Sequence, residues 1–225
     1  MVKTTERKAR AKRMVAYLKK AYPKPETELH YKTPFQLVVA VMLSAQCTDK
    51  AVNKVTDVIF KKYKGPKDFA GANLKTLTKE ISSLSFFRNK AKAVIAAAKI
   101  IEKSPPAGGF GGKVPRTVGE LTRLPGVAYK TANVVLGELY EIWEGIPTDT
   151  HVKRFAHRFD LVDSTDLTKI SKELEALVPK KDWMYVNNGL VLYGRYVCTA
   201  RPHACEEHPL TKLWPEAAGK WPKAK

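Results

Sequence analysis

Cysteine is scarce in this 225-residue chain, which contains only Cys47, Cys198 and Cys205. Three cysteines are too few for a disulfide framework, which excludes the small disulfide-stapled proteins and favours a reduced setting. Uninterrupted apolar runs of about 18 residues are also missing, so no membrane span is expected. The first residues are rich in lysine and arginine but lack an apolar core and a cleavage pattern. We therefore expect no secretory signal and a cytoplasmic location, nucleoid-associated in a prokaryote.

Acidic residues are in the minority. The chain has 40 lysines and arginines against 22 aspartates and glutamates, which gives a formal net charge of +18. Such an excess indicates a polyanionic partner, and nucleic acid is the leading candidate. The alternative is a solvated basic surface that serves solubility. Hydrophobic residues make up 44% of the chain, so we expect a folded protein rather than a disordered one.

Sustained alternation of apolar and polar residues, the pattern of half-buried strands, is also missing, which predicts an all-α fold. The expected helices cover residues 35–43, 52–59, 74–83, 91–101, 129–140, 151–159, 167–178 and 183–197. A basic helix over Met1–Lys20, with Met14, Val15 and Leu18 on one face, should dock on the body. Its charge either helps to hold DNA or is simply solvated. Ser104–Arg116 is rich in glycine and proline and is predicted to be a loop.

The stretch Arg123–Thr150 gathers the candidate chemistry. The turn Leu124–Ala128 leads into a helical run, and free N–H groups together with the helix dipole favour an anion there. Gly126 can adopt a positive φ and has no Cβ, so a phosphate can approach closely. Lys130 lies in the first helical turn, where the dipole disfavours the charged form of its amine and favours a nucleophile. Asp149 adds a carboxylate 19 positions later.

Several segments together resemble one known family. The stretches that carry the resemblance are LSAQCTDKAVNKVT (residues 43–56), LSFFRNKAKAV (84–94), GGKVPRT (111–117), LPGVAYKTANVVL (124–136) and PTDTHVKR (147–154). In this order they are similar to the endonuclease III family of DNA glycosylases, with a helix-hairpin-helix in the fourth stretch and the catalytic aspartate in the fifth. The segments span most of positions 30–200. A single turn of this kind would be weak evidence, but the ordered set is specific.

The resemblance implies two helical domains with a DNA-binding cleft between them. Residues 27–141 would form a six-helix domain with the helix-hairpin-helix, and residues 1–26 with 142–225 would form the second. The implied activity is base-excision repair of oxidised pyrimidines in duplex DNA by a monomeric glycosylase with AP-lyase activity. Two alternatives stay open, a helix-hairpin-helix DNA-binding protein without chemistry and a glycosylase for another lesion.

The resemblance assigns the two catalytic roles to Lys130, as the amine that attacks the sugar, and to Asp149, as the carboxylate that stabilises positive charge there. Each residue also has a simpler interpretation. Lys130 could be a phosphate-binding cation without covalent chemistry. Asp149 could be the N-cap of the helix that follows, and it could serve in both roles. His151 is interpreted as structural, because the chemistry needs no imidazole.

The predicted DNA contacts come from two loops and the hairpin. By resemblance Gln46 enters the space left by the extruded nucleotide and Phe86 wedges between the bases opposite it. The alternatives are an exposed loop glutamine and a core phenylalanine. The hairpin residues with predicted DNA contacts are Leu124, Gly126, Ala128 and Thr131. Ala128 stands where the family usually has a second glycine, which is tolerable if its φ is negative.

The C-terminal segment departs from the family, most members of which hold a four-iron, four-sulfur cluster with cysteines spaced C-x6-C-x2-C-x5-C. Cys198 and Cys205 match the first two positions, whereas His208 and Trp214 stand at the third and fourth. Tryptophan cannot ligate iron, so no cluster and no other cofactor are predicted. A zinc site from Cys198, Cys205, His203 and His208 has suitable ligand types, but its short spacing favours a packed, metal-free loop.

Overall fold

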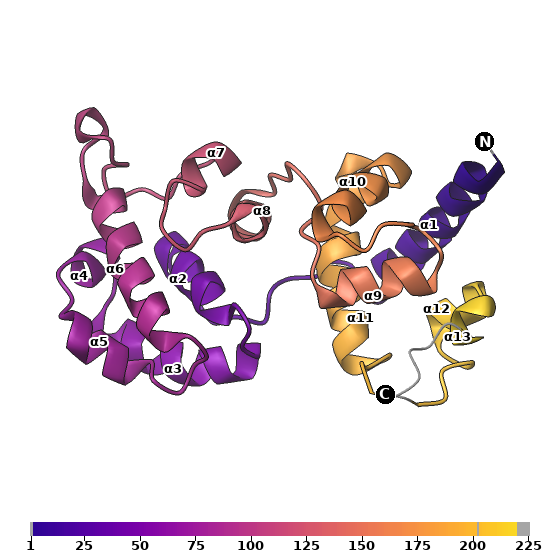
Figure 1. The fold of residues 1–225 in the computed structure, drawn as a ribbon, viewed down its shortest axis with the longest axis horizontal. Helices are drawn as coiled ribbons and strands as arrows, with labels where there is room; N and C mark the ends of the chain where they lie inside the picture. The colour runs from indigo at the N-terminus through magenta and orange to yellow at the C-terminus, as the bar shows by residue number, and fades with distance from the viewer. Residues whose placement is uncertain (1, 202, 220–225) are drawn as a thin grey trace. The chain divides into compact units, whose positions relative to one another are not determined.

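The computed structural model describes residues 2–201 and 203–219 and divides the chain into two compact units. The central unit is Glu28–Ile142, and the terminal unit joins Met1–Thr27 to Trp143–Lys225. Every regular element among the described residues is helical, and none is a strand, so the predicted all-α class is confirmed (Figure 1). No helix in the described part of the chain is both long and apolar enough to cross a bilayer.

The central unit packs its helices around α2 (Pro34–Ser44), which is buried along almost its whole length (Figure 1). Its start follows from the sequence, since the Thr33 side chain accepts a hydrogen bond from the Gln36 N–H and Pro34 occupies the first turn. The other helices of this unit are α3 (Asp49–Lys62), α4 (Pro66–Ala70), α5 (Leu74–Glu80), α6 (Phe87–Glu102), α7 (Val118–Leu121) and α8 (Tyr129–Tyr140). Because α2 carries no charged residue, it forms the core against which α3, α6 and α8 pack.

The terminal unit has its own core, built by helices from both ends of the chain. Its elements are α1 (Val2–Ala21), α9 (Thr150–Arg158), α10 (Leu167–Leu177), α11 (Leu190–Tyr196), α12 (Pro209–Leu213) and α13 (Glu216–Gly219). The predicted apolar face of α1 is confirmed, since Met14, Val15 and Leu18 are buried in this core. The helix expected over residues 183–197 contains a π-helical turn at Tyr185–Gly189 that leads directly into α11.

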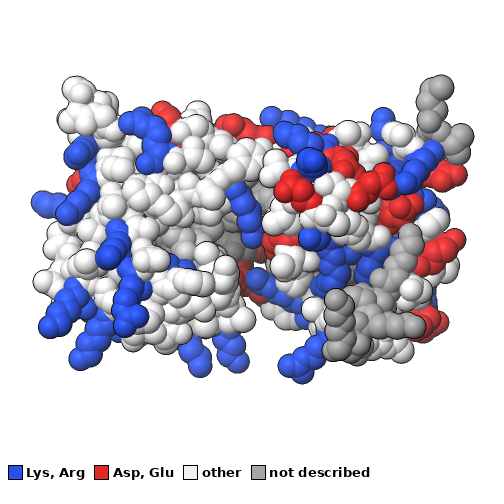
Figure 2. Space-filling model, viewed as in Figure 1, with Lys and Arg blue, Asp and Glu red and all other residues white. Residues whose placement is uncertain are grey.

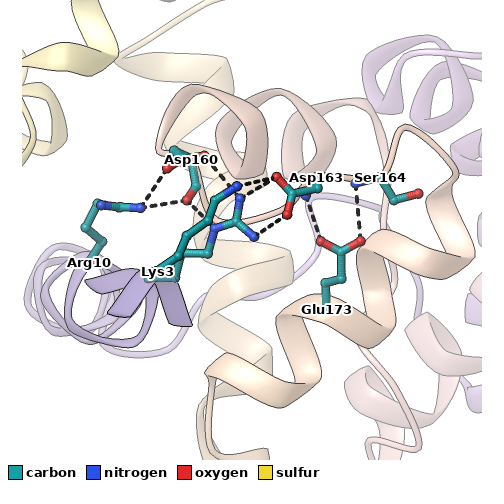
Figure 3. Close-up of polar contacts among 7 residues, drawn as sticks. Lys3, Arg10, Asp160, Asp163, Ser164 and Glu173 are labelled. Carbon is teal, nitrogen blue, oxygen red and sulfur yellow. Dashed lines mark hydrogen bonds and ion pairs between the residues drawn. The ribbon is translucent and has the colours of Figure 1, made fainter. Parts of the chain in front are cut away.

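Much of the positive charge of α1 is used inside the terminal unit. Arg7 donates to both carboxylate oxygens of Asp163, at 2.8 and 2.7 Å, and Arg10 donates to the Asp160 carboxylate at 2.9 Å. Lys3 adds a third cation at 2.8 Å from Asp163, and the Glu173 carboxylate accepts the Asp163 N–H at 2.7 Å (Figure 3). These arginines are buried, so they hold α1 on the turn after α9 and are not available to a ligand.

The Asp163 pairs make the stability of the terminal unit pH-dependent. Hydrogen bonds from Arg7 and then Lys3 hold the pKa of Asp163 well below its ordinary value of 3.8. A carboxylate with a lowered pKa stabilises the folded state above its unfolded pKa, and this stabilisation is lost as the pH falls toward the folded value. We therefore expect Asp163→Asn to lower the free energy of unfolding at pH 7, and the deficit to shrink progressively below about pH 5.

Urea unfolding of both proteins between pH 7 and pH 3 measures this difference. Glu26→Gln is the matched control, because Glu26 pairs with Lys24 at an exposed site where both side chains are more than half accessible. Its effect should be small at every pH. A deficit in Asp163→Asn that stays constant from pH 7 to pH 3 would contradict the assigned role.

Candidate active site

The hairpin between α7 and α8 has the backbone that the sequence predicts for an anion site. Thr117 caps α7 by accepting the Glu120 N–H at 3.2 Å, and Gly126 adopts a φ of +81° in the turn. Ala128, the N-cap residue of α8, has a φ of −88° and a ψ of 171°. Its negative φ shows that alanine fits here without strain. Since no side chain caps α8, the N-terminus of this 12-residue helix can receive a phosphate.

Lys130 lies in the first turn of α8 and is exposed. No hydrogen bond or ion pair engages its amine among the described residues. Thr131 follows it and is half-buried. The side chain of Leu124 is 1% exposed, and its N–H donates to the Leu121 carbonyl at 3.0 Å. Leu124 therefore anchors the hairpin in the core and does not present its side chain to a ligand.

A cavity of about 230 Å³ in the central unit brings together three of the predicted DNA-contacting residues. Gln46, Phe86 and Gly126 line it, with the other lining residues Met42, Ala45, Asn89, Lys90 and Ala93. Gln46 and Phe86 have φ values of +54° and +56°, in the left-handed region that side-chain-bearing residues rarely adopt. Phe86 is 61% exposed, so it is not a core residue. Strained, exposed residues at the rim of a cavity are typical of functional loops.

Lys90 holds the loop of Gln46 in place. The sequence around Lys90 does not predict this role. Although Lys90 is only 7% exposed, its ammonium donates to the carbonyls of Leu43 at 2.8 Å and Ala45 at 2.7 Å. Those carbonyls end α2, where a cation is favoured by the helix dipole. The ammonium also lies 3.3 Å from the Cys47 sulfur, which accepts the Ser85 N–H at 3.3 Å. This network joins the loop of Gln46 to the loop of Phe86.

Asp149, in the terminal unit, is the N-cap of α9. Its Oδ1 accepts the N–H groups of His151 at 2.8 Å and Val152 at 2.9 Å. The simpler interpretation of Asp149 as a cap is therefore confirmed. It leaves Oδ2 without a hydrogen-bond partner among the described residues, and the residue is half-buried. The capping contacts fix the direction of the carboxylate, so the second oxygen remains available for chemistry.

The segment before Asp149 is held by buried side chains from two other elements. Ser171 of α10 donates to the Ile146 carbonyl at 2.9 Å, and Asn187 of the π-helical turn donates to the Pro147 carbonyl at 2.7 Å. Both side chains are buried. Asn187 belongs to the π-helical turn Tyr185–Gly189, and π-helical turns frequently occur at functional sites. Neither residue could be assigned this role from the sequence.

Behind Asp149, α9 crosses α11 at very close range. A Cβ added to Gly194 would lie 2.3 Å from His151 Nδ1 and 2.7 Å from the Arg154 guanidinium. Arg154 donates to the carbonyls of Cys198 and Thr199, both at 2.7 Å, at the end of α11. His151 Nδ1 lies 3.2 Å from Arg154. His151 is thus part of the helix packing, as interpreted from the sequence.

The C-terminal loop is organised around a buried arginine. Arg158, at the end of α9, is 2% exposed, and its Nη1 and Nη2 lie 2.9 Å from the sulfurs of Cys198 and Cys205, respectively. The same guanidinium donates to the Ala217 carbonyl at 3.1 and 3.3 Å. Burial raises the pKa of the Cys198 thiol, and the positive charge of Arg158 opposes part of that rise.

These residues do not fit a four-iron cluster. The guanidinium of Arg158 bridges the two sulfurs that match the first two ligand positions. At the fourth position Trp214 has no donor for iron and lies 4.2 Å beneath the guanidinium of Arg10. At the third position a histidine, His208, stands in place of the usual cysteine thiolate.

Comparison with known proteins identifies the family of the chain. Residues 39–180 match the family model described as HhH-GPD superfamily base excision DNA repair protein. The chain is 43% identical to "Endonuclease III" of Synechocystis sp. over 216 residues, 96% of each chain. It is 42% identical to "Endonuclease III" of Bacillus subtilis over 193 residues, 85% of each chain.

Solved structures show the same fold. A trapped endonuclease III–DNA covalent intermediate matches with a TM-score of 0.85 at 34% identity, covering 95% of this chain and 98% of that one. A thermostable thymine-DNA glycosylase shares the fold with a TM-score of 0.75 at 21% identity, over 91% of this chain and 95% of that one. The chain therefore belongs to the HhH-GPD superfamily of base excision DNA repair proteins, and within it to the endonuclease III family.

Proposed function

We propose that this protein is a bifunctional DNA glycosylase and AP lyase that removes oxidised pyrimidines from damaged duplex DNA, with Lys130 as the nucleophile. The main support is the exposed amine of Lys130 in the first turn of α8. It follows directly after the turn of Gly126, whose free N–H groups at the uncapped helix N-terminus can bind a phosphate. A phosphate bound at that turn would bring the adjoining sugar toward the amine. The endonuclease III–DNA covalent intermediate among the structural relatives supports a covalent step.

The reaction begins with a nucleotide outside the base stack, because the sugar carbon is shielded within the duplex. The neutral amine of Lys130 forms a bond to C1′ as the bond from C1′ to the base breaks, and the base leaves with the electron pair and takes up a proton. The nitrogen loses one proton, and its lone pair then breaks the C1′–O4′ bond of the sugar ring. O4′ takes up a proton, and a protonated Schiff base remains. The Schiff base acidifies the C2′ proton, whose removal expels the 3′ phosphate by β-elimination.

Asp149 supplies the negative charge that this reaction needs. Positive character develops at the sugar as the base departs, and a fixed carboxylate stabilises such a state. Two N–H groups of α9 hold Oδ1 of Asp149, so Oδ2 can act without reorganisation. The same oxygen can assist proton transfer. Lys130 thus supplies the attacking amine, and Asp149 supplies the carboxylate that stabilises the charge on the sugar.

DNA binding would combine positive surface charge with insertion of side chains into the base stack. Lysine and arginine side chains stand on the surface of both units, with acidic side chains grouped beside them on the terminal unit (Figure 2). The exposed cations would neutralise phosphates, and the N-terminus of α8 would hold one of them. The exposed ring of Phe86 and the amide of Gln46 would occupy the gap in the stack, offsetting part of the cost of unstacking.

The protein would function without a four-iron cluster. Two of the four ligand positions carry His208 and Trp214. At the other two positions, Arg158 donates to the sulfurs of Cys198 and Cys205. It also places the protein in the cytoplasm, where its DNA substrate lies in a prokaryote and where thiols such as Cys47 stay reduced. We expect it to act as a monomer.

The nucleophile is tested by borohydride trapping on a duplex that contains thymine glycol or an abasic site. The wild-type protein should form a covalent DNA adduct, and Lys130→Ala should form none while it still binds the duplex. Lys75→Ala, which removes an exposed lysine from α5, is the matched control and should trap normally. Equal trapping by Lys130→Ala and the wild type would rule out Lys130 as the nucleophile.

The carboxylate is tested by Asp149→Asn, which keeps the capping oxygen and removes the charge. Asparagine caps helices about as well as aspartate, so the melting temperature should change little. Base removal in single-turnover assays should slow by roughly 10²–10⁴-fold. Asp166→Asn is the control, since Asp166 caps α10 by accepting the Lys169 N–H and has no proposed role in catalysis. The proposal for Asp149 fails if both variants keep wild-type rates.

The support given by Lys90 is tested by Lys90→Met. Losing the ammonium leaves the Leu43 and Ala45 carbonyls unpaired and frees the loop of Gln46, so base removal should slow by up to about 10²-fold. Affinity for undamaged duplex should stay close to that of the wild type. The exposed neighbour Lys92 provides the control, because Lys92→Met should at most weaken duplex affinity. Equal loss of base removal in the two variants would contradict the positioning role.

A further inference from the structure

The loop after α11 brings together three groups that bind metal ions elsewhere in proteins. Cys198, His203 and His208 each place one potential ligand atom within 4.8 Å of the others. Cys198 is 1% exposed and both histidines are half-buried. The short spacing in sequence favours a metal-free loop, but the chain folds back so that the three side chains converge on one point. This convergence is a property of the fold that the spacing does not reveal.

The two imidazoles are oriented for ligation. His203 Nδ1 lies 2.7 Å from the Arg201 carbonyl, which makes Nδ1 the protonated nitrogen and leaves a lone pair on Nε2. Metal-binding histidines usually make such a bond with the nitrogen that does not bind the ion. The His208 ring lies beside it, with the centroids 4.9 Å apart. His208 Nδ1 is buried and has no hydrogen-bond partner among the described residues.

We infer that Cys198, His203 and His208 form a binding site for one divalent transition-metal ion of the zinc class. A thiolate with two imidazoles is a donor set that suits zinc, and three protein ligands leave a fourth position for water. Such an ion would close the loop between residues 198 and 208 and fix it beside α9. The site is independent of the proposed reaction, because it contains neither Lys130 nor Asp149.

Arg158 and Cys205 make the assignment testable. Both Cys198 and Cys205 are buried, and the Arg158 guanidinium lies 2.9 Å from each sulfur. Only Cys198 belongs to the converging group. A guanidinium N–H that points at the Cys198 sulfur favours the thiolate, the form that binds metal, and acts as an outer-shell donor. Cys205 therefore serves as a control of the same type and burial.

The experiment is a cobalt titration of the full chain after treatment with a chelator. Cobalt bound by a thiolate and imidazoles gives a sulfur-to-metal charge-transfer band with intense visible bands, and these should saturate at one equivalent and disappear on addition of zinc. Loss of an outer-shell partner costs about 10–100-fold in metal affinity, so losing a ligand in Cys198→Ser or His203→Ala should cost at least about 100-fold. Cys205→Ser and Cys47→Ser should retain the band.

Circular dichroism of each variant checks that it is folded. If Cys198→Ser fails to fold, His203→Ala still tests the site, because His203 lies half-buried in a loop. The inference is wrong if no saturable charge-transfer band forms. Equal loss of affinity in Cys198→Ser and Cys205→Ser would also contradict the ligand set. Iron and inorganic sulfide in the protein as purified, with the broad visible absorption of a cluster, would overturn both this site and the proposed function without a cluster.

Discussion

The conformation of Gly126 is the constraint on which the central unit's site depends. A Cβ at this position would lie 2.9 Å from the Ala93 side chain of α6 and 3.1 Å from the Met42 side chain of α2, and the φ of +81° would strain any other residue. The hairpin turn thus rests directly on the helices whose ends carry Phe86 and Gln46. One close contact fixes the hairpin turn, the Lys130 backbone and the loops of Gln46 and Phe86 relative to one another.

Buried cations hold the loops of both units. Lys90 donates to the carbonyl of Leu43 at the end of α2. Arg158 donates to the sulfurs of Cys198 and Cys205 and to the Ala217 carbonyl. Arg7 pairs with the carboxylate of Asp163 after α9. Polar or anionic partners surround each of these side chains and offset the cost of burying it. The net charge of +18 therefore overstates the charge that DNA would meet, since part of it has a structural role.

The sequence predicts the parts of this structure that depend on local chemistry. Thr33, Thr117 and Asp149 cap the helices that follow them, and Gly126 takes the positive φ expected of it. The DNA contact of Leu124 stays a prediction, and its apolar side chain lies in the core. The tertiary partners could not be predicted. Nothing local marks Lys90 as buried, and the convergence of Cys198, His203 and His208 depends on the path of a loop.

Asp149 caps α9, and this structural role is compatible with the catalytic role proposed for it. Its Oδ1 meets the needs of a helix N-terminus, and this contact fixes where Oδ2 lies. Ser171 and Asn187 hold the two carbonyls just before it. The cap therefore gives a rigidly held carboxylate, and the catalytic role proposed for Asp149 would use its second oxygen.

The central claim is that the Lys130 nitrogen becomes bonded to the sugar. Its most direct test is to reduce the protein–DNA adduct, digest both components and map the modified peptide by tandem mass spectrometry. The account predicts the sugar remnant on Lys130, within the peptide that begins α8. A remnant on another lysine or on the terminal amine, with Lys130 unmodified, would contradict it.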